Sequence, residues 1–354
     1  MILIVNAGSS SIKAALFLPD LTRVLDGSVT EIAGAGQLRV GGERTGVSAP
    51  DHAAALALIL GSFAQAGYPV EALTAAGHRV VHGGAELTAP AALTPGVIAQ
   101  IEACIPLAPL HNPHNLTGVR ALAAAAPQLP QFASFDTAFH ASIPEVAYTY
   151  ALPQSQRDKG IRRYGFHGLS YAGLVVQLGA SLPHRLLALH LGNGASLCAI
   201  LDGRSVATSM GYSPLDGLVM GSRAGSIDGN AVLRLAEDYG IAAAADILNA
   251  RSGLTALAGT NDMATLLART DPAAQFAVQH YCHWAACQAG SAIVAMGGVD
   301  AIAFTGGIGE NAPAIRGSIV GHLSLFGALP VHVIAADEER QIARDVCALM
   351  AKDA

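Results

Sequence analysis

Three short segments rich in glycine, serine and asparagine have the composition of phosphate-binding turns. They span residues 6–11, 190–194 and 306–311, and each follows an apolar run typical of a buried strand. Glycine lets backbone N–H groups approach a phosphate closely, and serine hydroxyls add donors. Lys13, just after the first segment, is a cation that could offset phosphate charge. Together the segments predict a phosphate site, although none matches the P-loop or the dinucleotide-binding pattern.

Four charged or titratable side chains lie in otherwise apolar or small-residue segments. Arg79 lies inside an apolar run, Asp136 ends another, His167 stands beside glycine, and Arg223 belongs to a loop of small residues. A buried arginine needs an anionic partner. Each residue alone fits a structural salt bridge or a satisfied core histidine. Their shared position near glycine turns, in a chain with 13% charged residues, favours an anion site.

Composition excludes several classes of protein. The chain has 354 residues, 52% of them hydrophobic, and a mean hydropathy of +0.42. No stretch reaches the roughly 18 apolar residues of a spanning helix, so we expect no membrane partner. So apolar a chain must bury a core and is not disordered. The net charge of −6 argues against nucleic acid as a partner, because that would require a basic face.

Cysteine usage and the first residues indicate the compartment. The five cysteines are odd in number and form no C-x-x-C pair, so disulfides and a zinc site are both disfavoured. We expect five buried thiols in a reducing environment. The first residues lack the basic and apolar pattern of a signal peptide. These features predict a cytoplasmic protein.

Strands alternate with helices along the chain, which predicts an α/β fold. Apolar runs predict strands at 2–5, 12–18, 77–81, 131–135, 185–191, 196–201, 301–304 and 331–334. Helical spacing predicts helices at 51–67, 95–103, 115–126, 231–239, 242–248, 275–296 and from about 337. The segments 11–16 and 196–201 each follow a strand and a glycine turn. This similarity indicates either one unit used twice, giving two related α/β domains around a cleft, or two hairpins alike by chance.

Eight motifs in this order resemble those of the acetate kinase family, with its propionate and butyrate kinase relatives. They are LIVNAGSSSIK (3–13), GHRVVHGG (77–84), PLHNP (109–113), SFDTAFHASIP (134–144), RRYGFHG (162–168), HLGNGAS (190–196), SMGYSPLDGLVMGSR (209–223) and TGGIGEN (305–311). They cover nearly the whole chain. The resemblance implies two ribonuclease-H-like domains around a cleft, as in actin, hexokinase and the heat-shock chaperone ATPases. The first would comprise 1–149 and the C-terminal helix in 340–354, the second 150–339 with most of the nucleotide site.

The resemblance also implies a reaction and a homodimer. ATP and acetate would be converted reversibly to ADP and acetyl phosphate by direct in-line transfer, with Mg²⁺ as the metal or Mn²⁺ in its place. Arg79 would bind the substrate carboxylate, while Asp136, His167 and Arg223 would be catalytic. Asp136 would act as the acid/base residue or orient the substrate, and we expect the second role because acetate is already ionised at neutral pH. The remaining assignments are a methyl pocket of Val81, Leu110, Phe166 and Pro214; metal ligands Asn6 and Glu338; and nucleotide contacts Lys13, His190, Leu191, Gly192, Asn193, Gly194, Asp262, Met263, Ala264, Gly307, Ile308, Gly309, Glu310 and Asn311.

The sequence departs from the family pattern at several places. Ser226 and Gly229 replace an acid and a proline, and Ala264 stands where the family usually carries an arginine that could stack on the base. Three alternatives therefore stay open. The chain could prefer propionate, it could use another phosphoryl donor such as pyrophosphate, or it could be a catalytically silent nucleotide-binding switch.

Overall fold

The computed structural model describes residues 1–352 and divides the chain into two compact units. Unit 1 comprises Met1–Phe139 and the segment from Asp337 onward, and unit 2 comprises His140–Ala336. The boundaries expected from the sequence are 149/150 and 339/340. Residues 353–354, part of the first predicted domain, lie outside the described residues. Each unit contains a mixed sheet with helices on it, so the predicted α/β class is confirmed.

The sheet of unit 1 has eight strands in the order β5-β4-β3-β2-β1-β6-β8-β7. The predicted N-terminal hairpin is confirmed, because β1 pairs antiparallel with β2. On its other side β1 pairs parallel with β6, which pairs parallel with β8. The strands are β1 (Ile2–Ala7), β2 (Ser11–Phe17), β3 (Arg23–Thr30), β4 (Gln37–Val40), β5 (Glu43–Gly46), β6 (Ala75–Val80), β7 (Ala91–Ala92) and β8 (Gln131–Phe135).

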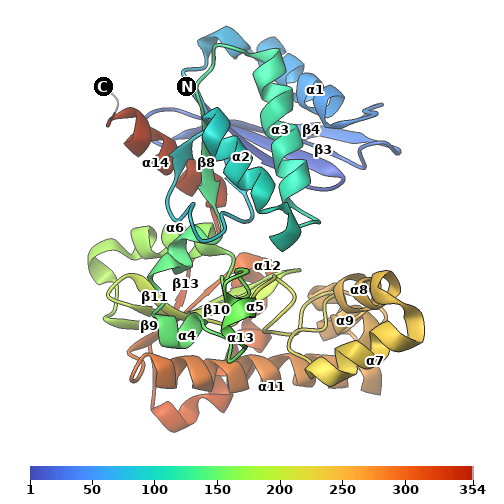
Figure 1. The fold of residues 1–354 in the computed structure, drawn as a ribbon, viewed down its shortest axis with the longest axis vertical. Helices are drawn as coiled ribbons and strands as arrows, with labels where there is room; N and C mark the ends of the chain where they lie inside the picture. The colour runs from blue at the N-terminus through green and yellow to red at the C-terminus, as the bar shows by residue number, and fades with distance from the viewer. Residues whose placement is uncertain (353–354) are drawn as a thin grey trace. The chain divides into compact units, whose positions relative to one another are not determined.

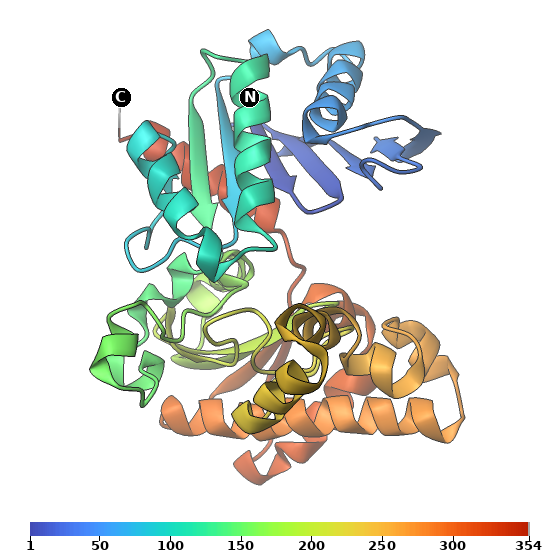
Figure 2. The same cartoon turned by 45° about the vertical axis from the view of Figure 1, so that its right-hand side comes forward.

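Helices cover both faces of this sheet (Figures 1 and 2). On one face, Gly118 of α3 lies against Val5 and Ala7 of β1, where a Cβ atom would be 2.9 Å from the Ala7 side chain. On the other, Gly77 lies beneath Ile342 of α14. The helices are α1 (His52–Gln65), α2 (Pro95–Ala103), α3 (Asn112–Ala125) and α14 (Glu338–Met350), with 3-10 turns η1 (Val70–Ala72) and η2 (Ile105–Leu107). Asp51 caps the start of α1, because its carboxylate accepts from the Ala54 N–H.

The five-stranded sheet of unit 2 repeats the central topology of unit 1. Its order, β11-β10-β9-β12-β13, matches β3-β2-β1-β6-β8 in both sequence order and strand direction. The first two strands of each sheet thus form a hairpin whose first strand also pairs parallel with a later strand, which supports the interpretation of one unit used twice. The strands are β9 (Arg185–Leu191), β10 (Ala195–Leu201), β11 (Arg204–Thr208), β12 (Ala301–Thr305) and β13 (Val331–Val333).

The helices of unit 2 include one that the sequence analysis described wrongly. Residues 306–311 form a helix rather than a turn, because Gly306, at φ +79°, leads the chain directly from β12 into it. The helices are α4 (Glu145–Tyr148), α5 (Gln154–Arg157), α6 (Gly168–Leu178), α7 (Gly229–Tyr239), α8 (Ile241–Ala250), α9 (Gly253–Ala258), α10 (Met263–Ala268), α11 (Pro272–Ala295), α12 (Gly306–Asn311) and α13 (Pro313–His322). Three 3-10 turns complete the list: η3 (Ala138–Ser142), η4 (Gly179–Ser181) and η5 (Ser324–Phe326).

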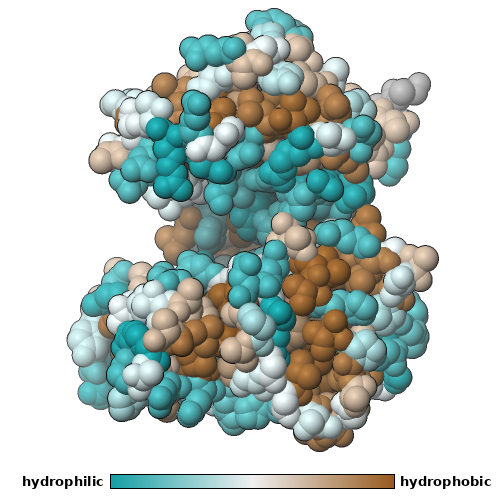
Figure 3. All heavy atoms as spheres, turned by 180° about the vertical axis from the view of Figure 1, so that it is seen from behind, coloured by the Kyte–Doolittle hydropathy of each residue, from teal (hydrophilic) through white to brown (hydrophobic). Residues whose placement is uncertain are grey.

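The surface reflects the apolar composition. Apolar areas lie among hydrophilic ones on the face displayed in Figure 3. No helix among residues 1–352 is long and apolar enough to cross a bilayer. All five cysteines are free thiols, but Cys287 is exposed and Cys347 half-buried, so the expectation of five buried thiols is wrong for these two. Both lie on helices, where the residue just before each of them, Ala286 and Val346, is buried instead.

Candidate active site

Unit 1 brings Arg79 and Asp136 into a buried ion pair. The two residues lie on and just beyond the neighbouring parallel strands β6 and β8. The Arg79 Nη2 atom is 2.5 Å from Asp136 Oδ2, and its Nε atom donates to both carboxylate oxygens at 3.1 and 3.2 Å. The Asp136 side chain is 1% exposed, that of Arg79 22%. The expected anionic partner for this arginine is thus confirmed, while part of the arginine side chain stays exposed.

Two further oxygen-bearing side chains surround the same guanidinium. Arg79 Nη1 lies 3.5 Å from Asn6 Oδ1, and its Nε lies 3.7 Å from Glu338 Oε2. Burial by itself would lower the pKa of Arg79, but the charges of Asp136 and Glu338 outweigh it and raise that pKa above its ordinary value. Arg79 therefore stays a cation at every pH at which the protein is folded. The cluster presents one fixed positive charge among three oxygen acceptors.

These oxygens have the chemistry of a magnesium site. Mg²⁺ prefers carboxylate and amide oxygens, and it usually takes one or two protein ligands together with water and phosphate. Asn6 and Glu338 supply one such oxygen each. No group of three or more Asp, Glu, His or Cys side chains in the described part of the chain is arranged to hold a metal by itself. The residues thus fit an ion that arrives with a phosphate chain.

The other predicted residues of unit 1 differ in how far they are exposed. Lys13 is exposed on β2, directly opposite Asn6 of β1. Val81 is 6% exposed and its N–H donates to Asn115 Oδ1 at 3.0 Å, which fixes the backbone just after Arg79. Leu110 is 60% exposed. Asn115 was missed by the sequence analysis, although it lies two residues beyond the end of the PLHNP motif.

In unit 2, His167 is held in an unusual backbone conformation. It precedes α6 with φ +59°, a left-handed value that costs about 1–3 kcal/mol in a residue other than glycine. Its Nδ1 atom is 2.9 Å from Ser196 Oγ, which in turn is 2.6 Å from the Tyr171 hydroxyl. The His167 ring stacks on His190 with centroids 4.2 Å apart. Strain retained within such a set of contacts is typical of functional sites.

Arg223 is a largely buried cation without a balancing charge. Its Nη1 atom donates to the Pro214 carbonyl at 3.2 Å, and burial lowers its pKa. No carboxylate within residues 1–352 pairs with it. Desolvating a charge without a partner is costly, so an unpaired buried arginine marks a place where an anion would be stabilised. Pro214, predicted for the methyl pocket, lies in the same loop and orients this guanidinium.

Gly194, in the turn between β9 and β10, separates His167 from Arg223. A Cβ atom on this glycine would lie 3.2 Å from His167 Nε2 and 3.9 Å from Arg223 Nη1. Both side chains therefore converge on the space above this glycine. Two nitrogen-bearing groups around one open position are suited to the oxygens of a phosphoryl group.

We expect Gly194→Ala to lower kcat at least about tenfold with little effect on folding, because the new methyl group occupies the space between the two donors. Steady-state kinetics and a thermal melt measure both quantities. Gly290→Ala on α11 is the matched control, since a Cβ atom there meets nothing within 4 Å. Equal kcat values for the two variants would contradict this use of the space above Gly194.

A cavity of 500 Å³ in unit 2 contains most of the predicted nucleotide contacts. Eight of the predicted residues line it: Gly192, Asn193, Asp262, Met263, Ala264, Gly307, Ile308 and Asn311. Asn261, Leu267 and Ala312 line it as well and were missed. Leu267 lies one helical turn after Ala264, so the spacing of α10 contained the signal. His190, Leu191, Gly194, Gly309 and Glu310 do not line the cavity, and Lys13 belongs to unit 1.

Two of the predicted nucleotide-binding residues have side chains that accept hydrogen bonds from the protein itself. The Asp262 carboxylate caps α10 by accepting from the Thr265 N–H and hydroxyl, which together with the Ala264 N–H lower its pKa. Glu310 Oε1 accepts from the Gly306 and Ala336 N–H groups at 3.0 and 2.9 Å. Asp262 thus caps a helix at the cavity, and Glu310, outside its lining, holds two backbone N–H groups.

His140, also missed, supports the segment that leads to His167. Its Nε2 atom is 2.9 Å from the Phe166 carbonyl oxygen and its Nδ1 atom is 2.8 Å from Ser205 Oγ. The carbonyl requires a proton on Nε2, and in the neutral ring Nδ1 then accepts from the serine hydroxyl. Burial lowers the pKa of His140 to about 4. Phe166, predicted for the methyl pocket, is itself buried at 1% exposure.

This histidine makes stability depend on pH. Below pH 6.5 His140 is protonated in the unfolded chain. In the folded protein its pKa is about 4, so the ring stays neutral between pH 6.5 and pH 4. The free energy of unfolding should therefore fall by up to about 1.4 kcal/mol per pH unit from pH 6.5 to pH 4 on account of His140. Urea denaturation at pH 7, 6 and 5 measures the slope. His140→Asn should reduce it, and an unchanged slope in that variant would contradict the assignment.

The geometry defines the class first: a two-unit α/β protein with a carboxylate–arginine cluster in one unit and converging histidine and arginine beside a cavity in the other. Comparison with known proteins identifies the family within this class. A model of the acetokinase family matches residues 1–348. An acetate kinase of Rhodopseudomonas palustris is 44% identical over 337 residues, covering 89% of this chain and 84% of the relative. The chain belongs to the acetokinase family.

Two solved structures agree with this assignment. A propionate kinase from Francisella tularensis superposes with a TM-score of 0.93 at 33% identity, covering 97% of this chain and 98% of its own. The acetate kinase of Porphyromonas gingivalis gives a TM-score of 0.91 at 33% identity over 99% of both chains. The family resemblance drawn from the motifs is thereby confirmed.

Proposed function

We propose that this kinase transfers the γ-phosphoryl group of ATP to acetate, giving ADP and acetyl phosphate. The observation that supports this most strongly is Arg223, a buried guanidinium without a carboxylate partner that converges with His167 on one position. Transfer of a phosphoryl group depends mainly on positioning and charge neutralisation, which such donors provide. The cavity lined by Asn193 and Gly307 would accept the nucleotide.

The reaction requires little acid–base chemistry. Acetate is ionised at neutral pH, so its oxygen attacks the γ-phosphorus directly; that O–P bond forms as the bond to the β-phosphate oxygen breaks, and ADP leaves with the electron pair. Arg79 would hold the acetate carboxylate, and Asp136 orients Arg79 through three hydrogen-bond contacts. Arg223 and His167 would stabilise the equatorial oxygens as charge spreads over them.

A divalent metal belongs to this proposal. When bound, Mg²⁺ would neutralise charge on the β- and γ-phosphates. Asn6 and Glu338 are the side chains that would hold it, because each offers an oxygen beside Arg79. Glu338 is the first residue of α14, whose preceding Asp337 caps the helix, so its position is fixed by the helix start.

The proposal is less specific about the acyl group of the phosphoryl acceptor, which distinguishes acetate from propionate. We assign the acetate methyl group to Val81, Leu110, Phe166 and Pro214. One additional methylene changes discrimination by about 1–3 kcal/mol, so we expect propionate to react more slowly than acetate. A solved relative with 33% identity is a propionate kinase, which makes propionate the alternative substrate.

Trapping of acyl phosphates with hydroxylamine tests the proposal. Purified protein with Mg²⁺ is incubated with acetate or propionate and with ATP, GTP or pyrophosphate, and the hydroxamate is measured. We expect the largest yield from acetate with ATP. A larger yield with propionate would identify propionate as the preferred substrate. A larger yield with pyrophosphate would identify pyrophosphate as the phosphoryl donor. Nucleotide binding without any hydroxamate would instead identify a silent nucleotide-binding switch.

Ala264 allows a direct test of the nucleotide cavity. This residue lines the cavity with a methyl group, where an arginine could place its guanidinium on the base. We expect Ala264→Arg to lower the KM for ATP several-fold, with kcat unchanged, because stacking stabilises bound nucleotide and transition state alike. Initial rates at varied ATP measure this. An unchanged KM would place the base elsewhere, and Arg251→Ala, which removes an exposed ion pair with Asp246, serves as control.

The assembly and location are proposals as well. We propose a homodimer, supported by apolar side chains exposed on α7 and α8: Leu233 and Tyr239 are 62% exposed and Ile241 is 82% exposed. Light scattering after size exclusion measures the mass. A cytoplasmic location is supported by the five free thiols.

A further inference from the structure

The loop that carries Arg223 has no regular structure of its own. It runs from residue 209 to residue 226, between β11 and α7, and no helix or strand is assigned within it. We call it the arginine loop. We propose that Arg163 and Asp216 are positioning residues that hold the arginine loop in the conformation that buries Arg223. This proposal rests on the proposed function and adds to it the residues that prepare the phosphoryl-stabilising cation.

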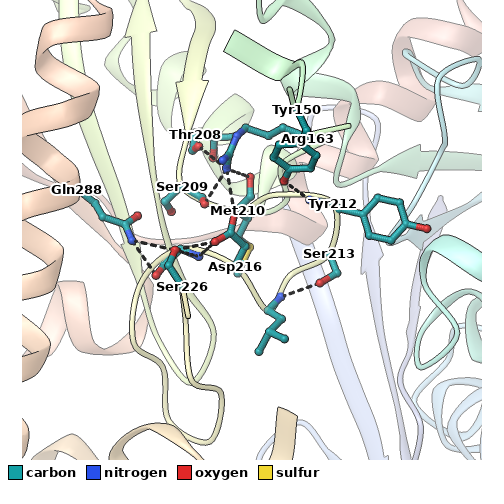
Figure 4. Close-up of polar contacts among 12 residues, drawn as sticks. Tyr150, Arg163, Thr208, Ser209, Met210, Tyr212, Ser213, Asp216, Ser226 and Gln288 are labelled. Carbon is teal, nitrogen blue, oxygen red and sulfur yellow. Dashed lines mark hydrogen bonds and ion pairs between the residues drawn. The ribbon is translucent and has the colours of Figure 1, made fainter. Parts of the chain in front are cut away.

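Arg163 fastens the beginning of the loop. Its Nη1 atom donates to the carbonyl oxygens of Ser209 and Met210, both at 2.9 Å, and lies 3.3 Å from that of Thr208. The same nitrogen is 3.4 Å from Asp216 Oδ2. Figure 4 shows the guanidinium reaching in among these groups. Since three consecutive carbonyls point at one cation, the exit of the chain from β11 is fixed.

Asp216 ties the middle of the loop to its end. Its Oδ1 atom accepts from the Ser226 hydroxyl at 2.6 Å and from the Gly217 N–H at 2.8 Å. The Ser226 N–H donates to the Gly217 carbonyl at 3.0 Å. Gln288 of α11 donates to that same carbonyl at 2.8 Å (Figure 4). The loop is thus closed on itself and anchored to a long helix.

Two glycines make this closure possible. Gly217 and Gly225 have φ values of +104° and +75°. A Cβ atom on Gly217 would lie 2.7 Å from the Ser209 carbonyl oxygen, and one on Gly225 would lie 2.6 Å from that of Leu218. Both backbones therefore approach within the loop more closely than any side chain would permit.

The fastened loop determines where Arg223 stands. Arg223 lies three residues before Ser226, and its guanidinium donates to the carbonyl of Pro214, two residues before Asp216. Because burial opposes its charge and no carboxylate balances it, Arg223 would gain solvation by swinging outward. Ordering such a segment also costs about 1–2 kcal/mol per residue in backbone entropy. The contacts of Arg163 and Asp216 offset both costs before substrate arrives.

A double-mutant cycle tests the proposal. We expect Arg163→Met to lower kcat about 10- to 100-fold, as misplacement of a catalytic group does, with the KM for ATP changed less than about twofold. The nucleotide cavity contains no residue of the arginine loop. If Arg163 acts through Arg223, adding Arg163→Met to Arg223→Ala should change kcat less than about twofold. Losses that multiply in the double variant would overturn the proposal, as would a single variant with the kcat of the wild type.

Companion variants separate positioning from general destabilisation. Arg185→Met is the matched control, because Arg185 also pairs with an aspartate in unit 2, Asp300, but at the start of β9. Its kcat should equal that of the wild type. Arg163→Lys keeps a donating cation and should recover part of the loss. A loss as large in Arg185→Met would mean that any broken ion pair in this unit has the same effect, which would overturn the proposal.

Amide hydrogen exchange tests whether Arg163 holds the arginine loop in place, and it does not depend on enzymatic turnover. The amides of Gly217 and Ser226 both donate within the loop, and we expect them to exchange faster in Arg163→Met than in Arg185→Met. If the wild type forms no acyl phosphate, the proposed function fails while this measurement still applies. Equal exchange in the two variants would overturn the fastening itself.

Discussion

Arg223→Ala should reduce kcat by about a thousandfold or more while the protein stays folded. Removing one donor that stabilises a developing charge costs about 10²–10³ in rate, and an arginine acting on a transferring phosphoryl group is worth about 10³–10⁵. Folding is retained because this guanidinium has no carboxylate partner to leave behind among the described residues, and its burial is itself unfavourable. Steady-state kinetics and a thermal melt measure the two effects.

ADP binding distinguishes a lost catalytic group from a damaged nucleotide site. The cavity formed by Asn193, Asp262 and Ile308 does not include Arg223, so calorimetry should give an unchanged dissociation constant for ADP. Arg223→Lys should retain some activity, since it keeps the charge without the planar donor geometry. If Arg223→Ala turned over like the wild type, Arg223 would have no part in the mechanism.

Arg79→Ala should also abolish turnover, and in addition it should destabilise unit 1. The substrate carboxylate loses its cation, which predicts a loss of at least about a hundredfold in kcat/KM. Removing one partner of a buried ion pair costs about 3–5 kcal/mol, because Asp136, at 1% exposure, loses the charge that balances it. Kinetics at varied acetate and urea denaturation measure these losses.

A second substitution separates the two consequences of losing Arg79. Asp136→Asn in the Arg79→Ala background removes the carboxylate charge that Arg79 had balanced, so part of the lost stability should return. Turnover should not return, since the acetate site still lacks its cation. Recovery of both quantities together would show that Arg79 serves the fold rather than the substrate.

The hairpins, the buried strands and the C-terminal helix could be predicted because local pattern decides them. Ile2–Ala7 and Arg185–Leu191 are apolar runs that end at glycine turns, and both are strands. The need of Arg79 for an anion followed from desolvation alone, and Asp136 meets it. The motif order was sufficient to identify the family.

Features that depend on contacts between residues far apart in the sequence could not be predicted from the sequence. A glycine-rich segment such as TGGIGEN reads as a turn, but after Gly306 the chain continues as a helix packed beside β9. His140 could not be recognised as a support for Phe166, because the bond joins residues 26 apart whose proximity depends on tertiary packing. The role of Arg163 depends on three loop carbonyls, and carbonyls leave no signal in the sequence.

Phosphorus NMR of one reaction mixture tests the central claim most directly. The protein is incubated with ATP, Mg²⁺ and acetate, and the phosphorus resonances are followed over time. Attack of acetate on the γ-phosphorus predicts ADP and acetyl phosphate appearing at equal rates, with neither product in the Arg223→Ala variant. Unchanged ATP, or acetyl-AMP with pyrophosphate from attack of acetate on the α-phosphorus, would contradict the account.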